Sequence, residues 1–229
     1  MQNDFRLVYL LHRRAHSDSQ LMLNTLVEGV GHLSMIARIK GRQALKHNAH
    51  LRPFTPILAQ YGGRHDLKYL NSFELAQNPL SLHGKQLYCG FYLNELVYRI
   101  VPRNEPQEQV FTLYQQHLNI LAEQTDVEPV LRSFEFQLLS LLGFGVEFDI
   151  DAHGQPISAN FSYQYVPELG FVPTDVPQYG FAGAALLAMA EHDFAKSTVR
   201  TAAKHLSRYI LKPLLGNKAL KSRELFISR

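Results

Sequence analysis

The chain of 229 residues contains a single cysteine, Cys89, and this scarcity removes two common ways of stabilising a fold. One cysteine cannot form an internal disulfide, and it cannot supply a cysteine-based zinc site. The sequence also lacks any run of about 18 apolar residues, so it predicts no membrane-spanning helix. Residues 1–4 lack the basic and apolar regions of a signal peptide. We therefore expect a soluble, cytoplasmic protein.

The signatures of common enzyme classes are absent as well. The sequence has no Walker A loop, no G-x-S-x-G elbow and no H-E-x-x-H motif. Its eleven histidines form no tight cluster with the cysteine. The neighbouring carboxylates Glu147, Asp149 and Asp151 fit a hairpin turn better than a calcium or magnesium site, because further ligands are missing. We expect no catalytic activity, no cofactor and no metal.

The charges are distributed unevenly along the chain. Residues 1–80 hold ten Lys and Arg against five Asp and Glu, and residues 196–229 hold nine against one. Residues 81–195 hold only four cations against fourteen carboxylates. Two basic ends around an acidic middle indicate a polyanion as partner of the ends. The alternative is an ordinary solvated surface.

Residues 1–80 predict a run of short β-strands, in which apolar and polar side chains alternate. Residues 13–19 are expected to form a polar connection, and residues 62–66 a hairpin turn. Pro56 is expected to place the fourth strand at a sheet edge or a bulge. Five antiparallel strands in some eighty residues favour a small closed barrel, with the OB-fold as the candidate. The expected strands cover residues 5–12, 21–27, 33–40, 54–61 and 67–75.

Cations gather in the first loop, the third strand and the loop that follows it. Barrels of this kind bind single strands through a basic groove and stacked aromatic rings. Cations that cluster in this way would neutralise phosphates and release counterions. The candidate DNA-binding residues of this patch are Arg13, Arg14, Arg38, Lys40, Arg42, Lys46 and Arg52.

Residues after 80 predict mainly helices. The segment 87–102 is apolar on nearly all sides, so we expect a buried central helix. Glu95 and Arg99 are spaced to form an ion pair inside it; the alternative is a polar binding site. Gly143 is expected to end a helix that begins near Asp126. Other helices are expected at residues 104–121, 181–194 and 197–211, and a hairpin at about 144–165.

Two sets of cations in the helical part allow two interpretations. Arg200, Lys204 and Arg208 are spaced four residues apart, so they form either a solvated helix face or a cationic ridge for nucleic acid or an acidic protein. Arg132 lies close in sequence to Glu128 and Glu135. It is interpreted either as a partner of these carboxylates or as a binding cation beside an apolar groove.

Several short motifs occur in order along nearly the whole chain. They are Asn24-Thr25, Ala37-Arg38-Ile39-Lys40-Gly41-Arg42, Arg52-Pro53-Phe54, Tyr92-Leu93-Asn94-Glu95-Leu96, Leu131-Arg132-Ser133-Phe134-Glu135 and Leu220-Lys221-Ser222-Arg223-Glu224-Leu225-Phe226. Together these motifs make the chain similar to the RecO family of recombinational repair proteins. Many members of that family carry a four-cysteine zinc site, and this chain resembles the branch that lost the metal.

The resemblance implies a recombination mediator in DNA repair, associated with the nucleoid. Such a protein binds single- and double-stranded DNA, promotes annealing, and with RecR helps to load RecA onto strands coated by single-strand-binding protein. The acidic tail of single-strand-binding protein needs an apolar pocket beside a cation. Arg132 is the preferred cation, with Phe134 nearby, and Arg103 is the second candidate. A stand-alone RNA- or DNA-binding module is the alternative function, and a metal-dependent nuclease the third.

Together these patterns predict an α+β protein. Residues 1–80 are expected to form an N-terminal OB-fold β-barrel that binds nucleic acid. Residues 81–229 are expected to form a mainly α-helical domain with a small β-hairpin insertion at about 144–165. A basic C-terminal helix and tail are expected at about 196–229.

Overall fold

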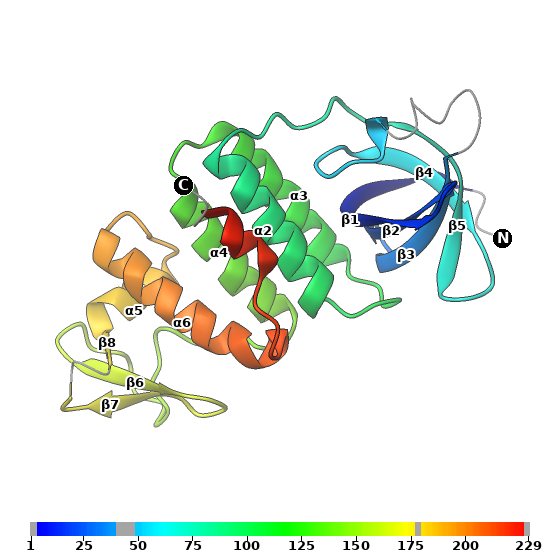
Figure 1. The fold of residues 1–229 in the computed structure, drawn as a ribbon. Coiled ribbons are helices and arrows are strands. Elements are labelled where there is room, and N and C mark those ends of the chain that lie inside the picture. Colours follow the sequence, from blue (N-terminus) through cyan, green and yellow to red (C-terminus); the bar gives the residue numbers. More distant parts are fainter. Residues whose placement is uncertain (1–3, 40–48, 177–179, 227–229) are drawn as a thin grey trace. The chain divides into compact units, whose positions relative to one another are not determined.

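The computed structural model describes residues 4–39, 49–176 and 180–226. The chain divides into two compact units, whose elements are labelled in Figure 1. The barrel unit comprises Met1–Thr125 with Ala219–Arg229, and the helical unit comprises Asp126–Lys218. This grouping differs from a division at residue 80, because the first helices and the C-terminal segment pack with the barrel. No helix among the described residues is long and apolar enough to cross a membrane.

Five strands close into the barrel that the alternation predicts, which confirms the OB-fold with a helical region after it (Figure 1). Their order around the barrel is β1-β2-β3-β5-β4. Every neighbouring pair is antiparallel except β3 with β5, which is parallel. The strands are β1 (Arg6–Ser17), β2 (Gln20–Val27), β3 (Gly31–Arg38), β4 (Ile57–Gly62) and β5 (Leu67–Leu75).

Alternate side chains of these strands fill the barrel. Leu10, Leu23 and Met35 are among its fully buried apolar residues, and Leu51 joins them from outside the strands. Two local expectations were wrong. Residues 13–17 continue β1 rather than forming a loop, so only residues 18 and 19 make the turn. Pro56 precedes β4, which pairs on both sides and is no edge strand, because closure leaves no free edge.

The central helix α2 (Lys85–Ile100) packs against β1 and against α3 (Glu108–Glu123). Asn94 of α2 is buried and donates hydrogen bonds to the carbonyl oxygens of Leu10 and Leu11, at 3.5 and 3.1 Å. Its amide oxygen accepts a 2.5 Å hydrogen bond from the Tyr114 hydroxyl of α3. One polar side chain thus joins a strand and two helices, and its hydrogen-bonding capacity is used.

The C-terminal segment forms a short helix, η2 (Lys221–Phe226), which packs on α2. The Glu95 carboxylate accepts hydrogen bonds from the backbone nitrogens of Lys221 and Ser222, at 3.0 and 2.8 Å. Arg99 lies 3.9 Å from the same carboxylate, so the expected pair exists. Because a carboxylate at a helix N-terminus satisfies free N–H groups, the main role of Glu95 is to hold η2.

The described part of the helical unit combines helices with a small sheet of strand order β7-β6-β8 (Figure 1). Gly143 ends α4 as expected: it has a φ of 83°, and the Phe144 nitrogen donates to the Leu139 oxygen. The elements are α4 (Val127–Leu141), β6 (Ser162–Val166), β7 (Gly170–Thr174), β8 (Phe181–Ala182), α5 (Gly183–Ala190) and α6 (Ser197–Leu215).

The hairpin lies later in the chain than residues 144–165, so its expected bounds were wrong. Its strands are β6 and β7, whereas residues 150–156 form a turn closed by a single bridge between Ile150 and Pro156. Phe148, before that turn, lies in none of the strands and packs against α4, where its ring and that of Phe136 lie 5.1 Å apart. Pro173 lies within β7, an edge strand, where a missing N–H is tolerated.

Candidate nucleic-acid interface on the barrel

The strand register places one row of side chains across the outside of the barrel. Arg14 of β1 is opposite Met22 of β2, Met22 is opposite Ile36 of β3, and Ile36 is opposite Tyr69 of β5. Arg38 follows Ile36 by two residues, so it projects from the same side of β3. Neighbouring strands are about 5 Å apart, so this row spans roughly 15 Å. We call the surface around Arg14, Arg38 and Tyr69 the barrel face.

The polar groups of the barrel face are open to solvent. Arg14 and Arg38 are exposed, and the Tyr69 side chain is 50% exposed. Among the described residues, no carboxylate lies within 4.0 Å of either guanidinium. Exposed guanidinium groups neutralise phosphates, and an exposed ring accepts a stacked base. Tyr69 was missed by the sequence argument, although alternation in β5 could have shown that it faces outward.

The other cations expected in this patch have different positions. Arg13 projects to the opposite side of β1, beside Leu23, and its Nη1 donates a 2.8 Å hydrogen bond to the Leu51 carbonyl oxygen. This contact holds Leu51, which is part of the barrel core, so Arg13 has a structural role. Arg52 is exposed. The remaining three, Lys40, Arg42 and Lys46, lie outside the described residues.

A second cationic cluster surrounds Tyr98 of α2 in the same unit. The His12 ring stacks on Tyr98 with centroids 5.7 Å apart, and the Arg103 guanidinium lies 5.5 Å from the same ring. Burial lowers the pKa of His12, and the positive charges of Arg14 and Lys221 lower it further. The first strand and the C-terminal segment therefore both contribute positive charge here, which only the tertiary structure reveals.

His32 lies beside this cluster as a buried neutral ring. Burial lowers its pKa to about 4, and the positive charge of Arg103 also lowers it. The Nδ1 atom faces the Val101 carbonyl oxygen at 3.5 Å, a weak contact, and Nε2 has no hydrogen-bond partner. The barrel unit thus keeps this ionisable group uncharged in its interior.

Comparisons with a family model and with known proteins agree with each other. Residues 82–224 match the family model described as Recombination protein O C terminal. The chain is 59% identical to the DNA repair protein RecO of Pseudoalteromonas translucida (strain TAC 125), over 99% of this chain and 98% of that protein. The protein of the same name from Haemophilus influenzae (strain 86-028NP) is 41% identical over 99% and 97%. The chain belongs to the RecO family. This membership gives it a role in DNA repair and recombination.

In this RecO-family chain the three cations that were expected to form a ridge on α6 differ in their ion pairing and exposure. The Arg200 Nη1 lies 2.7 Å from the Asp126 carboxylate and 4.0 Å from that of Glu128. A second guanidinium nitrogen donates to the Ala195 oxygen at 3.0 Å. Arg200 therefore ties the start of α6 to the start of α4. Farther along α6, Lys204 is half-buried and Arg208 is exposed.

Arg132, the preferred partner-binding cation, is in the interior of the helical unit. It is only 7% exposed, its Nη1 lies 2.8 Å from the Glu135 carboxylate, and it donates a 3.1 Å hydrogen bond to the Ser207 hydroxyl. Phe134 is fully buried. The ion-pair interpretation of Arg132 is the observed one, so the structure corrects its assignment, and that of Phe134, as partner-binding residues. Arg103 remains exposed.

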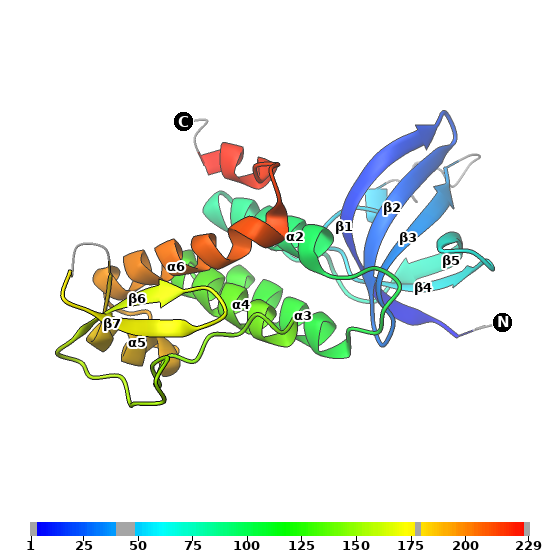
Figure 2. The same ribbon diagram turned by 90° about the horizontal axis from the view of Figure 1, so that it is seen from below.

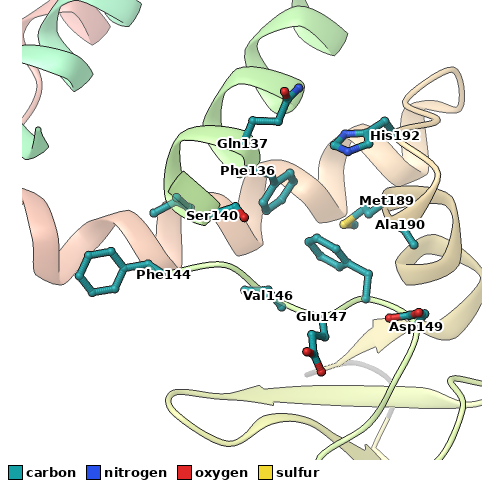
Figure 3. Close-up of a pocket in the computed structure, with 12 residues that line it drawn as sticks. Phe136, Gln137, Ser140, Phe144, Val146, Glu147, Asp149, Met189, Ala190 and His192 are labelled. Carbon is teal, nitrogen blue, oxygen red and sulfur yellow. The ribbon is translucent and has the colours of Figure 1, made fainter. Parts of the chain in front are cut away.

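The helical unit contains a hollow of about 330 Å³ (Figure 3). Figure 3 shows Phe136 of α4 and Met189 of α5 on its walls, and the segment with Glu147 and Asp149 along one side. Its shape suits an apolar side chain, but two carboxylates disfavour an anion. Among the residues that the structure describes, no three His, Cys, Asp or Glu side chains are grouped so that they could hold a metal. Asp151 accepts backbone hydrogen bonds from His153 and Gln155, as in a turn.

Proposed function

We propose that this RecO-family chain is a recombination mediator that binds single- and double-stranded DNA through the barrel face. It promotes annealing of complementary strands and, with RecR, loading of RecA onto strands coated by single-strand-binding protein. Its place of action is the cytoplasm, at the nucleoid. The observation that carries the proposal is the juxtaposition of Arg14, Arg38 and Tyr69 on one side of the barrel.

The barrel face supports DNA binding for two physical reasons. The arginines meet phosphates of either a single strand or a duplex, which releases condensed counterions and makes affinity depend on salt. The Tyr69 ring can stack only on an unpaired base, so it favours single strands. Cations near Tyr98 from β1, from η2 and from the segment after α2 extend the positive field of the same unit.

The test replaces both arginines in one variant, Arg14→Ala with Arg38→Ala. We measure oligonucleotide binding by fluorescence anisotropy over a range of salt concentrations. Each lost phosphate contact removes about 0.7 from the log–log salt slope on single strands, so the double variant should lose roughly 1.4. Arg64→Ala with Lys68→Ala, in the β4–β5 turn and β5, is the matched control with the same change in charge. An unchanged slope in the arginine variant would place the DNA site elsewhere.

The tail of single-strand-binding protein requires a new site, because Arg132 is buried. A groove between α5 and α6 has a volume of about 550 Å³ and combines apolar walls with Lys196 and His205. Asp193 also lines it, but its carboxylate accepts a 2.9 Å hydrogen bond from the Ala195 nitrogen. We propose that the tail binds in this α5–α6 groove. The last residue of the tail, which is apolar, would lie between the alanine side chains that line the groove, and the acidic residues of the tail would lie near Lys196.

Titration of a labelled tail peptide against Lys196→Ala tests this site. Loss of a charge-assisted contact costs on the order of 1.5–3 kcal/mol, about one to two decades in affinity. Arg103→Ala removes the other exposed candidate cation and should leave the peptide affinity unchanged. If Arg103→Ala weakens binding and Lys196→Ala does not, the tail binds on the barrel unit.

Two other functional classes remain as alternatives with separate tests. A stand-alone nucleic-acid-binding module would bind oligonucleotides but would not bind purified RecR in a pull-down. A metal-dependent nuclease would cleave a labelled strand only when a divalent cation is added. Binding of RecR without strand cleavage is the result that the proposed function requires.

A further inference from the structure

The helical unit presents an aromatic pair at its surface, away from the groove and the hollow described above. Tyr209 of α6 is 53% exposed, although it lies on a helix whose other face is buried. Tyr165 of β6 is half-buried, and the two rings meet edge to face with centroids 5.8 Å apart at 87°. Figure 2 shows β6 running beside α6. Tyr165 thus supports one side of a ring whose other surface is open to solvent.

Two cations flank this exposed ring. Arg208 precedes Tyr209 and Lys212 follows it by three residues, so Arg208 and Lys212 are i,i+4 neighbours on α6. Both are exposed, and among the described residues no carboxylate lies within 4.0 Å of their charged groups. Arg200, two turns earlier, is neutralised by Asp126. Positive charge is therefore available at the end of α6 that carries Tyr209.

We propose that Tyr165, Tyr209, Arg208 and Lys212, called here the tyrosine surface, form a second site for single-stranded nucleic acid. An unpaired base stacks on Tyr209 while Arg208 and Lys212 contact the phosphates on either side of it. A duplex cannot use the ring, because its bases are already stacked. The inference rests on the proposed function, since it assigns a second contact to the same class of ligand. A chain with two such sites can hold two strands, as annealing requires.

The composition of the tyrosine surface distinguishes a strand from an acidic peptide. Carboxylates of a peptide would need the two cations but would gain little from an open aromatic face. Bases of any sequence present a flat π surface that a tyrosine ring stabilises. The Tyr209 ring and the two cations therefore make separable contributions to the binding of a strand, and these contributions differ in their dependence on salt.

The experiment uses the full chain and a fluorescent 12-nucleotide thymidine strand. Tyr209→Ala should weaken binding at the second site roughly 5- to 100-fold without changing its salt slope. Tyr209→Phe keeps the ring and should bind as the wild type does. Lys212→Ala should lower the slope by about 0.7. Phe161→Ala is the control, because Phe161 is 62% exposed in the same unit and should contribute nothing. Thermal unfolding by circular dichroism checks that each variant is folded.

Each outcome decides the inference independently of the proposed function. Wild type should bind two strands per chain, and Tyr209→Ala and the double variant of Arg14 and Arg38 should each retain one strong site. If Tyr209→Ala binds as the wild type does, the tyrosine surface is overturned while the barrel face stands. If Tyr209→Ala weakens the binding of duplex and of single strands equally, the stacking of an unpaired base on Tyr209 is overturned. Weakening of the acidic tail peptide alone would show a protein site and also overturn the inference. If the double variant of Arg14 and Arg38 binds as the wild type does while Tyr209→Ala weakens binding, the barrel face is overturned and the tyrosine surface stands.

Discussion

The barrel unit exposes Arg14 and Arg38 on the outside of its strands, whereas the helical unit buries Arg132 against the Glu135 carboxylate. The barrel unit also has a buried ionisable group, but His32 is held there as a neutral ring. Desolvation of a charge is costly, so an interior keeps an ionisable group only when it is neutralised or paired. The functional value of a basic residue therefore depends on its solvent access, which residue type and spacing do not show.

The largest effect is expected for Arg132→Ala. This change removes the guanidinium that pairs with the buried Glu135 carboxylate, which should lower the free energy of unfolding by about 3–5 kcal/mol. Chemical denaturation followed by circular dichroism measures the difference. Arg208→Ala, an exposed arginine of the same unit, is the control and should change stability by less than about 0.5 kcal/mol. Similar stabilities for the two variants would contradict the buried ion pair.

The second largest effect concerns His32, which should make the stability of the protein fall in acid. Its folded pKa of about 4 lies below the usual histidine value of 6.5, so the unfolded chain binds a proton more readily. The stability associated with neutral His32 is therefore complete above pH 6.5 and is lost as the pH falls toward 4, by up to about 3 kcal/mol. Denaturation curves for wild type and His32→Phe across this range measure it. The variant should show a shallower fall, and an identical fall in both would assign the acid sensitivity to other groups.

The smallest effect is expected for Arg200→Ala. Arg200 pairs with Asp126, whose side chain is more than half exposed, so solvent screens the pair and its loss should cost at most about 1 kcal/mol. Thermal unfolding in low and in high salt measures this contribution, which should shrink as salt rises. A loss as large as that of Arg132→Ala would remove the distinction between exposed and buried arginines on which the comparison rests.

Local patterns predicted the barrel and most of the helices. Period-two alternation marked the five strands, and Gly143 and the apolar stripe marked the bounds of α4. The hairpin was misplaced because the apolar character of Phe148 has another reason: its ring packs against Phe136 and Phe171. An apolar residue in a sequence does not show whether its side chain packs against a helix or against a neighbouring strand.

The candidate sites were less predictable than the fold. The basic character of residues 6–52 was evident, but the register decided that Arg14 and Arg38 share a side of the barrel while Arg13 does not. A change of one residue in register reverses the side of every side chain. The bulge in β1 near Leu10 is a feature that alternation alone does not reveal.

The class of the protein follows from its sequence. Strand alternation and helical periodicity are local properties, and they were sufficient for an OB-fold barrel followed by a helical region, while short motifs in order along the chain carried the resemblance to the RecO family. The availability of each cation to a ligand, in contrast, depends on the tertiary structure. Solvent access, the Arg200–Asp126 ion pair and the edge-to-face contact of Tyr165 with Tyr209 depend on contacts between residues far apart in the chain. Such contacts are set by packing, which no short stretch of sequence contains.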